Sequence, residues 1–201
     1  VKQARGREAL ARFPIEIERD GGTLKVRPAY PPTAGAMFGS VSFDIKVPAS
    51  VNKIKINNVS GRIKVAKLAG DVDQELETIS GAIESERSGD LRAKSTSGSI
   101  DFSFAGSRLY AHSISGKIEG EIRNLEPGGS VDVETVSGSV QLEAFPALDA
   151  TLRLQSVSGS ISCGFPMSIT EKKEHRLEGR IGAGSAEVNV KTVSGSIRLE
   201  R

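Results

Sequence analysis

Seven serine hydroxyls recur at one fixed place in a repeated motif, each followed directly by glycine. A serine attacks a carbonyl only if a base lies within hydrogen-bonding reach and a third group orients that base. The sequence has two histidines, His112 and His175, so no catalytic set can serve seven equivalent serines. We therefore interpret the serine-glycine pairs as structural corners and expect no catalytic residues. The pairs are Ser60 and Gly61, Ser80 and Gly81, Ser97 and Gly98, Ser115 and Gly116, Ser137 and Gly138, Ser158 and Gly159, and Ser194 and Gly195.

Metal and cofactor chemistry have little support in the residue pattern. Neither histidine has a cysteine, a second histidine or a paired carboxylate at metal-ligand spacing, so we predict no metal site. Cys163 is the only cysteine, which excludes an intrachain disulfide, and its apolar neighbours at alternate positions predict a small buried side chain. Gly179, Gly182 and Gly184 superficially match a phosphate-binding loop, but a strand rather than a helix is expected to follow them. We predict a turn there and no cofactor.

Carboxylates on the expected outer faces are the remaining residues that could do chemistry. Two of them could act as acid and base on a polysaccharide if stacking brought them within reach of each other. They alternate with Lys and Arg, as the charges of a solvated face do, so we interpret them as solubilising side chains. A polysaccharide-active enzyme is the least favoured alternative. The residues are Asp73, Glu75, Glu77, Glu84, Glu86, Asp101, Glu119, Glu121, Asp132 and Glu134.

Composition argues against several classes of partner. Lys and Arg total 27 against 25 Asp and Glu, a formal net charge of +2, and aromatic residues make up 4% with no Trp. The chain therefore lacks the basic surface and the stacking aromatics that nucleic-acid binding uses. No apolar run is long enough to cross a bilayer, so we expect no membrane insertion by this segment. The chain begins with Val and its first residues lack the apolar core of a secretion signal, so we expect a fragment without its native N-terminus.

A repeat predicts the elements that position these residues. An apolar residue or Thr, then Ser-Gly, one variable residue and Ile or Val recur, with the glycines 20, 17, 18, 22, 21 and 36 residues apart. A period near 20 with alternating apolar and polar residues is typical of a solenoid whose coils stack one strand apart. We predict an all-β, single-domain parallel β-solenoid, or β-helix, of about seven coils. The predicted coils are residues 53–70, 71–89, 90–106, 107–129, 130–149, 150–185 and 186–201.

Two further columns flank each predicted corner. The residue two places before the serine is small or polar, which predicts a stacked hydrogen-bonding ladder. These residues are Asn58, Thr78, Ser95, Ser113, Thr135, Ser156 and Thr192. The Val, Ile or Thr directly before each serine forms the second column, and the sequence leaves open whether it faces inward or outward.

The N-terminal segment is predicted to cap the solenoid. Phe13 to Val26 alternates apolar and charged residues around an Asp-Gly-Gly turn, which predicts a β-hairpin. Val41 to Val47 predicts a strand that ends at Pro48. We assign residues 1–48 to this cap and residues 49–201 to the repeats, as one continuous domain.

The C-terminal end departs from the pattern. Residues 160–185, in the long sixth coil, form either a protruding hairpin, which we favour, or a degenerate extra coil. The last coil ends at Leu199, Glu200 and Arg201 without a capping segment. We therefore expect an open strand edge there that could pair with another molecule.

Several segments between residues 41 and 201 together resemble one known family. They are Ser42 to Pro48, the repeated Val/Ile-Ser-Gly-x-Ile, Leu68 to Val72, and Gly179 through Ile197. This ensemble resembles the bacterial putative adhesin domain family, a domain family of unknown function related to the head domain of putative autotransporter adhesins. The resemblance implies a β-solenoid with an adhesin-like role and supplies no catalytic residues. Such families often carry Asp after Ser-Gly, where this chain has Arg62, Ala82, Ser99, Lys117, Ser139, Ser160 and Ser196.

From these observations we expect a non-enzymatic binding or display module at the cell surface or in the cell envelope. Its partner would be a protein or a glycan surface. The alternative is a scaffold that self-associates through the ends of the solenoid. A sedimentation series over protein concentration would separate the two.

Overall fold

The computed structural model describes residues 15–28, 42–66, 68–145 and 148–201. The chain divides into two compact units, Val1–Pro48 and Ala49–Arg201, and each is described by itself. Every regular element of the described residues is a β-strand, which confirms the all-β class. Within the same residues no helix is found that could span a membrane.

The first unit contains a β-hairpin. Strands β1 (Ile15–Asp20) and β2 (Thr23–Pro28) pair antiparallel, and Gly21 at the tip has a φ of 56°, which suits glycine. Arg27 on β2 pairs with Glu16 and Glu18 on β1 at 2.8 and 2.9 Å. The predicted hairpin is confirmed for these residues, while Phe13 lies outside the described part of the chain.

Residues 42–48 form no strand, so the strand predicted there is wrong. Alternating polarity indicates which side chains a strand would bury, but a strand also needs a neighbour for its backbone hydrogen bonds. Among the described residues no strand pairing includes this segment. Val41 lies outside those residues, and the capping role of residues 1–48 stays a prediction.

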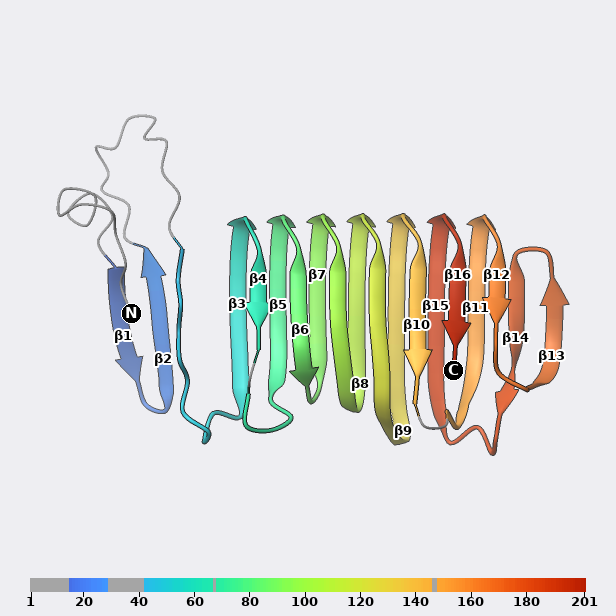
Figure 1. Ribbon diagram of the computed structural model, residues 1–201, viewed down its shortest axis with the longest axis horizontal. Helices are drawn as coiled ribbons and strands as arrows, with labels where there is room; N and C mark the ends of the chain where they lie inside the picture. The colour runs from blue at the N-terminus through green and yellow to red at the C-terminus, as the bar shows by residue number, and fades with distance from the viewer. Residues whose placement is uncertain (1–14, 29–41, 67, 146–147) are drawn as a thin grey trace. The chain divides into compact units, whose positions relative to one another are not determined.

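The second unit is built from pairs of strands that meet at the Ser-Gly corners (Figure 1). The strands before a corner form what we call the leading sheet: β3 (Lys53–Ser60), β5 (Asp73–Ser80), β7 (Leu91–Ser97), the second halves of β8 (Ile100–Ser115) and β9 (Ile118–Ser137), β11 (Ala150–Ser158) and β15 (Ala186–Ser194). The strands after a corner form the trailing sheet: β4 (Ile63–Val65), β6 (Ile83–Ser88), the first halves of β8 and β9, β10 (Val140–Ala144), β12 (Ile161–Cys163) and β16 (Ile197–Glu200). A leading strand, its corner and its trailing strand are called a coil below.

Corresponding strands of neighbouring coils pair in parallel and in register. Ser60 lies opposite Ser80, and Ser80 lies opposite Ser97. Strand β8 continues from the trailing sheet of one coil into the leading sheet of the next, with register shifts around Gly106. The second bend is therefore a bend within a strand at this place, whereas Ser-Gly always interrupts the strand. The predicted solenoid-like stacking of mostly parallel strands is confirmed.

The coils at the C-terminal end do not stack in their sequence order. Strand β15 pairs in parallel with β9 on one side and with β11 on the other. Strand β16 likewise pairs with β10 and with β12. The last coil of the sequence therefore lies inside the stack, as the red ribbon between yellow and orange shows in Figure 1. The predicted open edge at Leu199, Glu200 and Arg201 is wrong, because β16 has a parallel neighbour on each side.

Asp149 ties the start of β11 to the start of β15. Its Oδ1 accepts hydrogen bonds from the backbone N–H groups of Gly184, at 2.6 Å, and Ser185, at 3.3 Å. The Ser185 hydroxyl donates in turn to the Asp149 carbonyl at 3.2 Å. A Cβ on Gly182 would lie 2.8 Å from the same Oδ1, and this glycine has a φ of 63°. Gly179 is part of a strand that ends at Ile181, and the predicted turn is confined to residues 182–185, which lead into β15 and hold the inserted coil in place.

An antiparallel hairpin completes this end of the solenoid. Strands β13 (Ser168–Lys173) and β14 (Arg176–Ile181) pair with each other, and β14 pairs antiparallel with β11. The long sixth coil therefore contains the favoured hairpin and not a degenerate coil. Strand β13, which carries Lys172 and Lys173, forms the outermost strand of the path, and such charges discourage edge-to-edge pairing.

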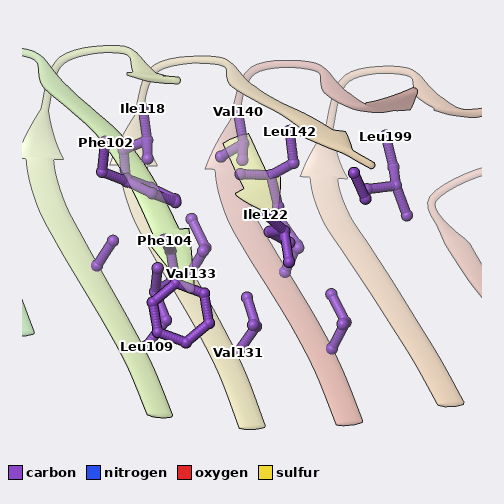
Figure 2. Close-up of a cluster of buried hydrophobic side chains, with 14 of the residues drawn as sticks. Phe102, Phe104, Leu109, Ile118, Ile122, Val131, Val133, Val140, Leu142 and Leu199 are labelled. Carbon is purple, nitrogen blue, oxygen red and sulfur yellow. The ribbon is translucent and has the colours of Figure 1, made fainter. Parts of the chain in front are cut away.

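Apolar side chains from both sheets fill the interior, as the labelled residues in Figure 2 show. The residue two places after each corner glycine is Ile or Val, and at most positions it is fully buried. These residues are Ile63, Ile83, Ile100, Ile118, Val140, Ile161 and Ile197, of which Ile161 is only partly buried. A small residue in one coil makes room for a large one in the next. A Cβ on Gly120 would lie 2.1 Å from the ring of Phe102, so glycine leaves the space that this ring fills. This packing fixes the distance between the two sheets and holds their outer faces rigid.

Candidate binding surface

The corner glycines and serines form one stacked column. The Gly61 N–H donates to the Ser80 carbonyl at 2.9 Å, and Gly195 donates likewise to Ser158 at 3.0 Å. Gly116 has a φ of 149°, and a Cβ on it would lie 2.2 Å from the Gly98 carbonyl oxygen. Backbone conformation and close approach therefore both require glycine. The serine side chains are exposed at all seven corners.

The predicted polar ladder lies directly beside this column. The hydroxyls of Ser95 and Ser113 donate to the carbonyls of Gly81 and Gly98 in the neighbouring coil, at 3.4 and 3.3 Å. Thr135, Thr192 and Ser156 make the equivalent bonds at 3.5, 3.2 and 3.2 Å. These hydroxyls are buried, and a buried hydroxyl with a partner avoids a desolvation penalty. The ladder adds a side-chain hydrogen bond to each corner it reaches.

The ladder changes at its two ends. Asn58 donates to the carbonyl of its own corner glycine, Gly61, at 3.2 Å, and the Thr78 hydroxyl is left without a partner. At the other end, His175 Nδ1 lies 3.1 Å from the Gly159 carbonyl, where the hydroxyl of a further coil would lie. His175 therefore acts as the end piece of the ladder, and its Nδ1 carries the proton in this contact.

The residues directly before the corner serines form an exposed apolar row, which we call the corner stripe. Val59 is 68% exposed, Ile114 46% and Val193 47%. In spatial order the corner stripe consists of Val59, Ile79, Thr96, Ile114, Val136, Val193 and Val157. The direction that the sequence left open is thus outward. Strict alternation from the buried Leu91, Ala93 and Ser95 was the signal that could have settled it, because it places the next residue on the outer face.

A row of polar side chains runs beside the corner stripe on the outer face of the leading sheet. Its members, which we call the charge row, are in spatial order Asn57, Glu77, Lys94, His112, Glu134, Lys191 and Gln155. Lys94 lies 3.7 Å from Glu77, and Lys191 lies 3.4 Å from Glu134. His112 lies 3.9 Å from Glu134 and, among the described residues, belongs to no group that could hold a metal ion. A shallow groove over the first four coils is lined by both rows, including Val59, Ile79 and His112.

Most of the outward carboxylates that the sequence singled out have basic or amide partners. Glu75 pairs with Lys55 at 2.7 Å, Glu84 with Arg62 at 3.2 Å, and Asp132 accepts from Asn189 at 3.0 Å. Asp101 differs, because it lies in register between Glu84 and Glu119. Burial, together with these two carboxylates, raises its pKa. Stacked carboxylates of this kind arise from the register of the coils.

The other candidate groups are dispersed. Cys163 is partly buried against the core, and burial raises the pKa of its thiol, which disfavours the reactive thiolate. Across the described part of the chain no group of three or more His, Cys, Asp or Glu side chains could hold a metal ion. The features that the structure gathers in one place are therefore the corner stripe, the serine hydroxyls and the charge row.

Comparison with known proteins places the chain in a family. No curated protein matches it. It is similar to the crystal structure of a protein described as a putative cell adhesion protein from Clostridium sporogenes ATCC 15579, with a TM-score of 0.39 and 13% identity over 94% of this chain and 76% of that one. The family description Toastrack DUF4097 matches residues 13–200, in agreement with the expected domain family of unknown function. The chain therefore belongs to the Toastrack (DUF4097) family.

Proposed function

We propose that this chain is a non-enzymatic, adhesin-like module that displays fixed columns of side chains to a protein or glycan surface outside the cytoplasm. The observation that carries the proposal is the in-register stacking of the coils, which sets like positions of neighbouring coils about 4.8 Å apart in straight rows. A rigid array of this kind binds without first being ordered, so little conformational entropy is lost on contact.

The outer face of the trailing sheet carries carboxylates in rows across neighbouring strands. Glu121, Glu143 and Glu200 lie opposite one another on three adjacent strands. Arg123 lies 2.8 Å from Glu121 and Arg198 lies 3.5 Å from Glu200, and these partners offset part of the repulsion between the like charges of the row. A partner that brings basic groups to this row would relieve the repulsion, which favours a basic protein surface as the contact.

Adhesion of particles coated with the chain tests the proposal. Beads carrying the chain would be compared with albumin-coated beads on immobilised fibronectin, collagen, mucin and bacterial cell-wall sacculi. We expect saturable retention on at least one surface, reduced at least about fivefold by the triple change Glu121→Gln, Glu143→Gln and Glu200→Gln. A matched control changes three carboxylates of the leading sheet, Asp73→Asn, Glu75→Gln and Glu187→Gln, and should keep its retention.

Retention no greater than that of albumin on every surface would contradict the binding role. Release of reducing sugar from a polysaccharide, lost on replacing one outward carboxylate, would contradict the non-enzymatic role. Fractionation of cells that produce the full-length gene product tests the compartment, and recovery only in the cytoplasm would contradict display at the envelope.

A further inference from the structure

The corner stripe is an exposed apolar surface that no segment covers among the described residues. Seven positions at strand spacing give it a length of about 29 Å. Six of the seven side chains are Val or Ile, and their exposed fractions run from 43% for Val136 to 68% for Val59. Contiguous exposed apolar surface of this kind marks an interaction site in soluble proteins.

We propose that two copies of the chain pair side by side through their corner stripes, in antiparallel orientation, about a two-fold axis at the coil of Ile114 and His112. The pairing sets Ile114 against Ile114 of the second copy. It sets Ile79 against Val193 and Val59 against Val157 in the same way. This proposal concerns the corner stripe and the charge row of the leading sheet, and it is independent of what the trailing sheet binds.

The order of charges in the charge row indicates both that the partner is a second copy of the chain and that the two copies are antiparallel. Read from one end it runs Asn57, Glu77, Lys94, His112, Glu134, Lys191 and Gln155. Reversal about His112 sets Glu77 against Lys191, Lys94 against Glu134, and Asn57 against Gln155. Every charged side chain of the row thus meets one of opposite sign, and the two terminal amides meet each other.

The parallel orientation does not bring these charges together. A parallel pair with the corner stripes in contact has its two-fold axis along the stripe, which places the two charge rows on opposite sides of the interface, so their charged side chains do not meet. Electrostatic complementarity of this kind gives an interface its register more than its affinity. A second copy in antiparallel orientation is therefore the occupant that the charges fit.

The complementarity depends on the interleaved order of the last two coils. Lys191 takes its place in the charge row because β15 lies between β9 and β11. In sequence order, Glu77 would face Gln155, and Lys191 would face Asn57. The insertion of the last coil thus produces the order of charges that is complementary to a second, antiparallel copy.

The expected association is weak. Two rows about 29 Å long cover a footprint of roughly 400 Å² per copy, about half that of a standard interface. Lys94 and Lys191 already have partners within their own chain, Glu77 and Glu134, so pairing adds a second counter-ion to each. We expect a micromolar dissociation constant that rises with salt.

Sedimentation of charge-swap variants tests the proposal. The full chain would be measured from about 1 μM to about 1 mM at low salt. Glu77→Lys alone and Lys191→Glu alone each place like charges in contact twice per dimer, so each should weaken dimerisation about tenfold. The double variant Glu77→Lys with Lys191→Glu restores both contacts and should return to within about threefold of the original constant.

Controls separate the interface from effects within one chain. In the double variant, the lysine introduced at position 77 lies beside Lys94, and the glutamate introduced at position 191 lies beside Glu134 of the same chain. A purely intrachain effect would therefore make the double variant worse than either single variant. Glu143→Lys, on the trailing sheet, should leave dimerisation unchanged. Ile114→Asp, at the two-fold axis, should abolish it while the monomer keeps its thermal transition.

Three results would overturn the proposal. They are a monomer at every concentration, a double variant as weak as the weaker single variant, or dimers that persist in Ile114→Asp. The adhesion test is unaffected by any of these results, because the variant expected to lose retention changes only the trailing sheet.

Discussion

Two aspartates, Asp90 and Asp101, have opposite pKa shifts because of the coils next to them. Burial alone would raise the pKa of Asp90, but hydrogen bonds from the backbone and side chain of Arg108 and from Ser107 hold it below its ordinary value. Asp101 has burial as its largest influence and the carboxylates of Glu119 and Glu84 beside it, so its pKa is raised. The hydrogen bond from the Ser99 hydroxyl, at 3.3 Å, does not reverse that shift. The same residue type therefore stabilises the fold at one position and weakens it at the other.

Replacing each aspartate with asparagine should change stability in opposite directions. A raised folded-state pKa means that ionised Asp101 disfavours folding, so stability falls as pH rises through this pKa. Asp101→Asn should therefore increase the free energy of unfolding at pH 7 by roughly a few tenths of a kcal/mol, and the gain should vanish in acid. Asp90→Asn should reduce stability at pH 7, and its loss should vanish as pH falls through the depressed pKa. Urea titrations between neutral and acidic pH measure both, and changes of the same sign at pH 7 would contradict this assignment.

The corners require glycine both for its positive φ and for the close approach of the neighbouring coil. Comparing Gly116 with Gly61 distinguishes the two requirements. Gly116 and Gly61 both have positive φ, but a Cβ would lie 2.2 Å from a carbonyl oxygen only at Gly116. At Gly61, the first corner of the stack, the nearest atom would be 3.6 Å away. Gly116→Ala should thus cost roughly 3 kcal/mol or more, and Gly61→Ala only the backbone strain of about 1–2 kcal/mol. Thermal or urea unfolding measures the difference, and Gly70→Ala, which has open space around it, should be nearly neutral.

Equal costs at Gly116 and Gly61 would show that backbone conformation alone selects glycine.

The sequence predicted the corners, the polar ladder beside them and the β13–β14 hairpin, because turn residues and alternation are local signals. The sequence wrongly predicted a strand within residues 42–48. A strand needs a neighbouring strand to pair with, and the sequence of the segment does not specify one. Alternation predicts that the side chains of Val59 and its equivalents point outward only if the backbone stays extended up to the serine, and the sequence does not show that it does.

The order of the coils is a property of the whole molecule, and the sequence did not predict it. Inward residues such as Val133, Leu154 and Val190 are apolar in every coil, so each coil can pack on almost any other. The choice is made by contacts that lie outside the repeat. Asp149 joins the starts of β11 and β15, and β14 covers the far edge of β11. With β14 on the far edge of β11, the last coil of the sequence packs on the other edge of β11, between β11 and β9.

The interleaved order of the coils also gives the charge row opposite charges at positions related by reversal about His112. Disulfide trapping in the trailing sheet tests this order away from the corner stripe. Arg198 lies opposite both Gln141 and Ser162, whereas Gln141 and Ser162 are separated by the strand between them. Neighbouring strands lie about 4.8 Å apart, within disulfide range, and strands one coil further apart lie about 9.6 Å apart, beyond it.

The measurement uses a Cys163→Ser background, mild oxidation and mass analysis of the monomer. Gln141→Cys with Arg198→Cys, and Ser162→Cys with Arg198→Cys, should each form an intrachain disulfide rapidly. Gln141→Cys with Ser162→Cys should remain reduced under the same conditions. Rapid closure of the Gln141→Cys and Ser162→Cys pair, with none between positions 141 and 198, would show that the coils stack in sequence order and not in the interleaved order.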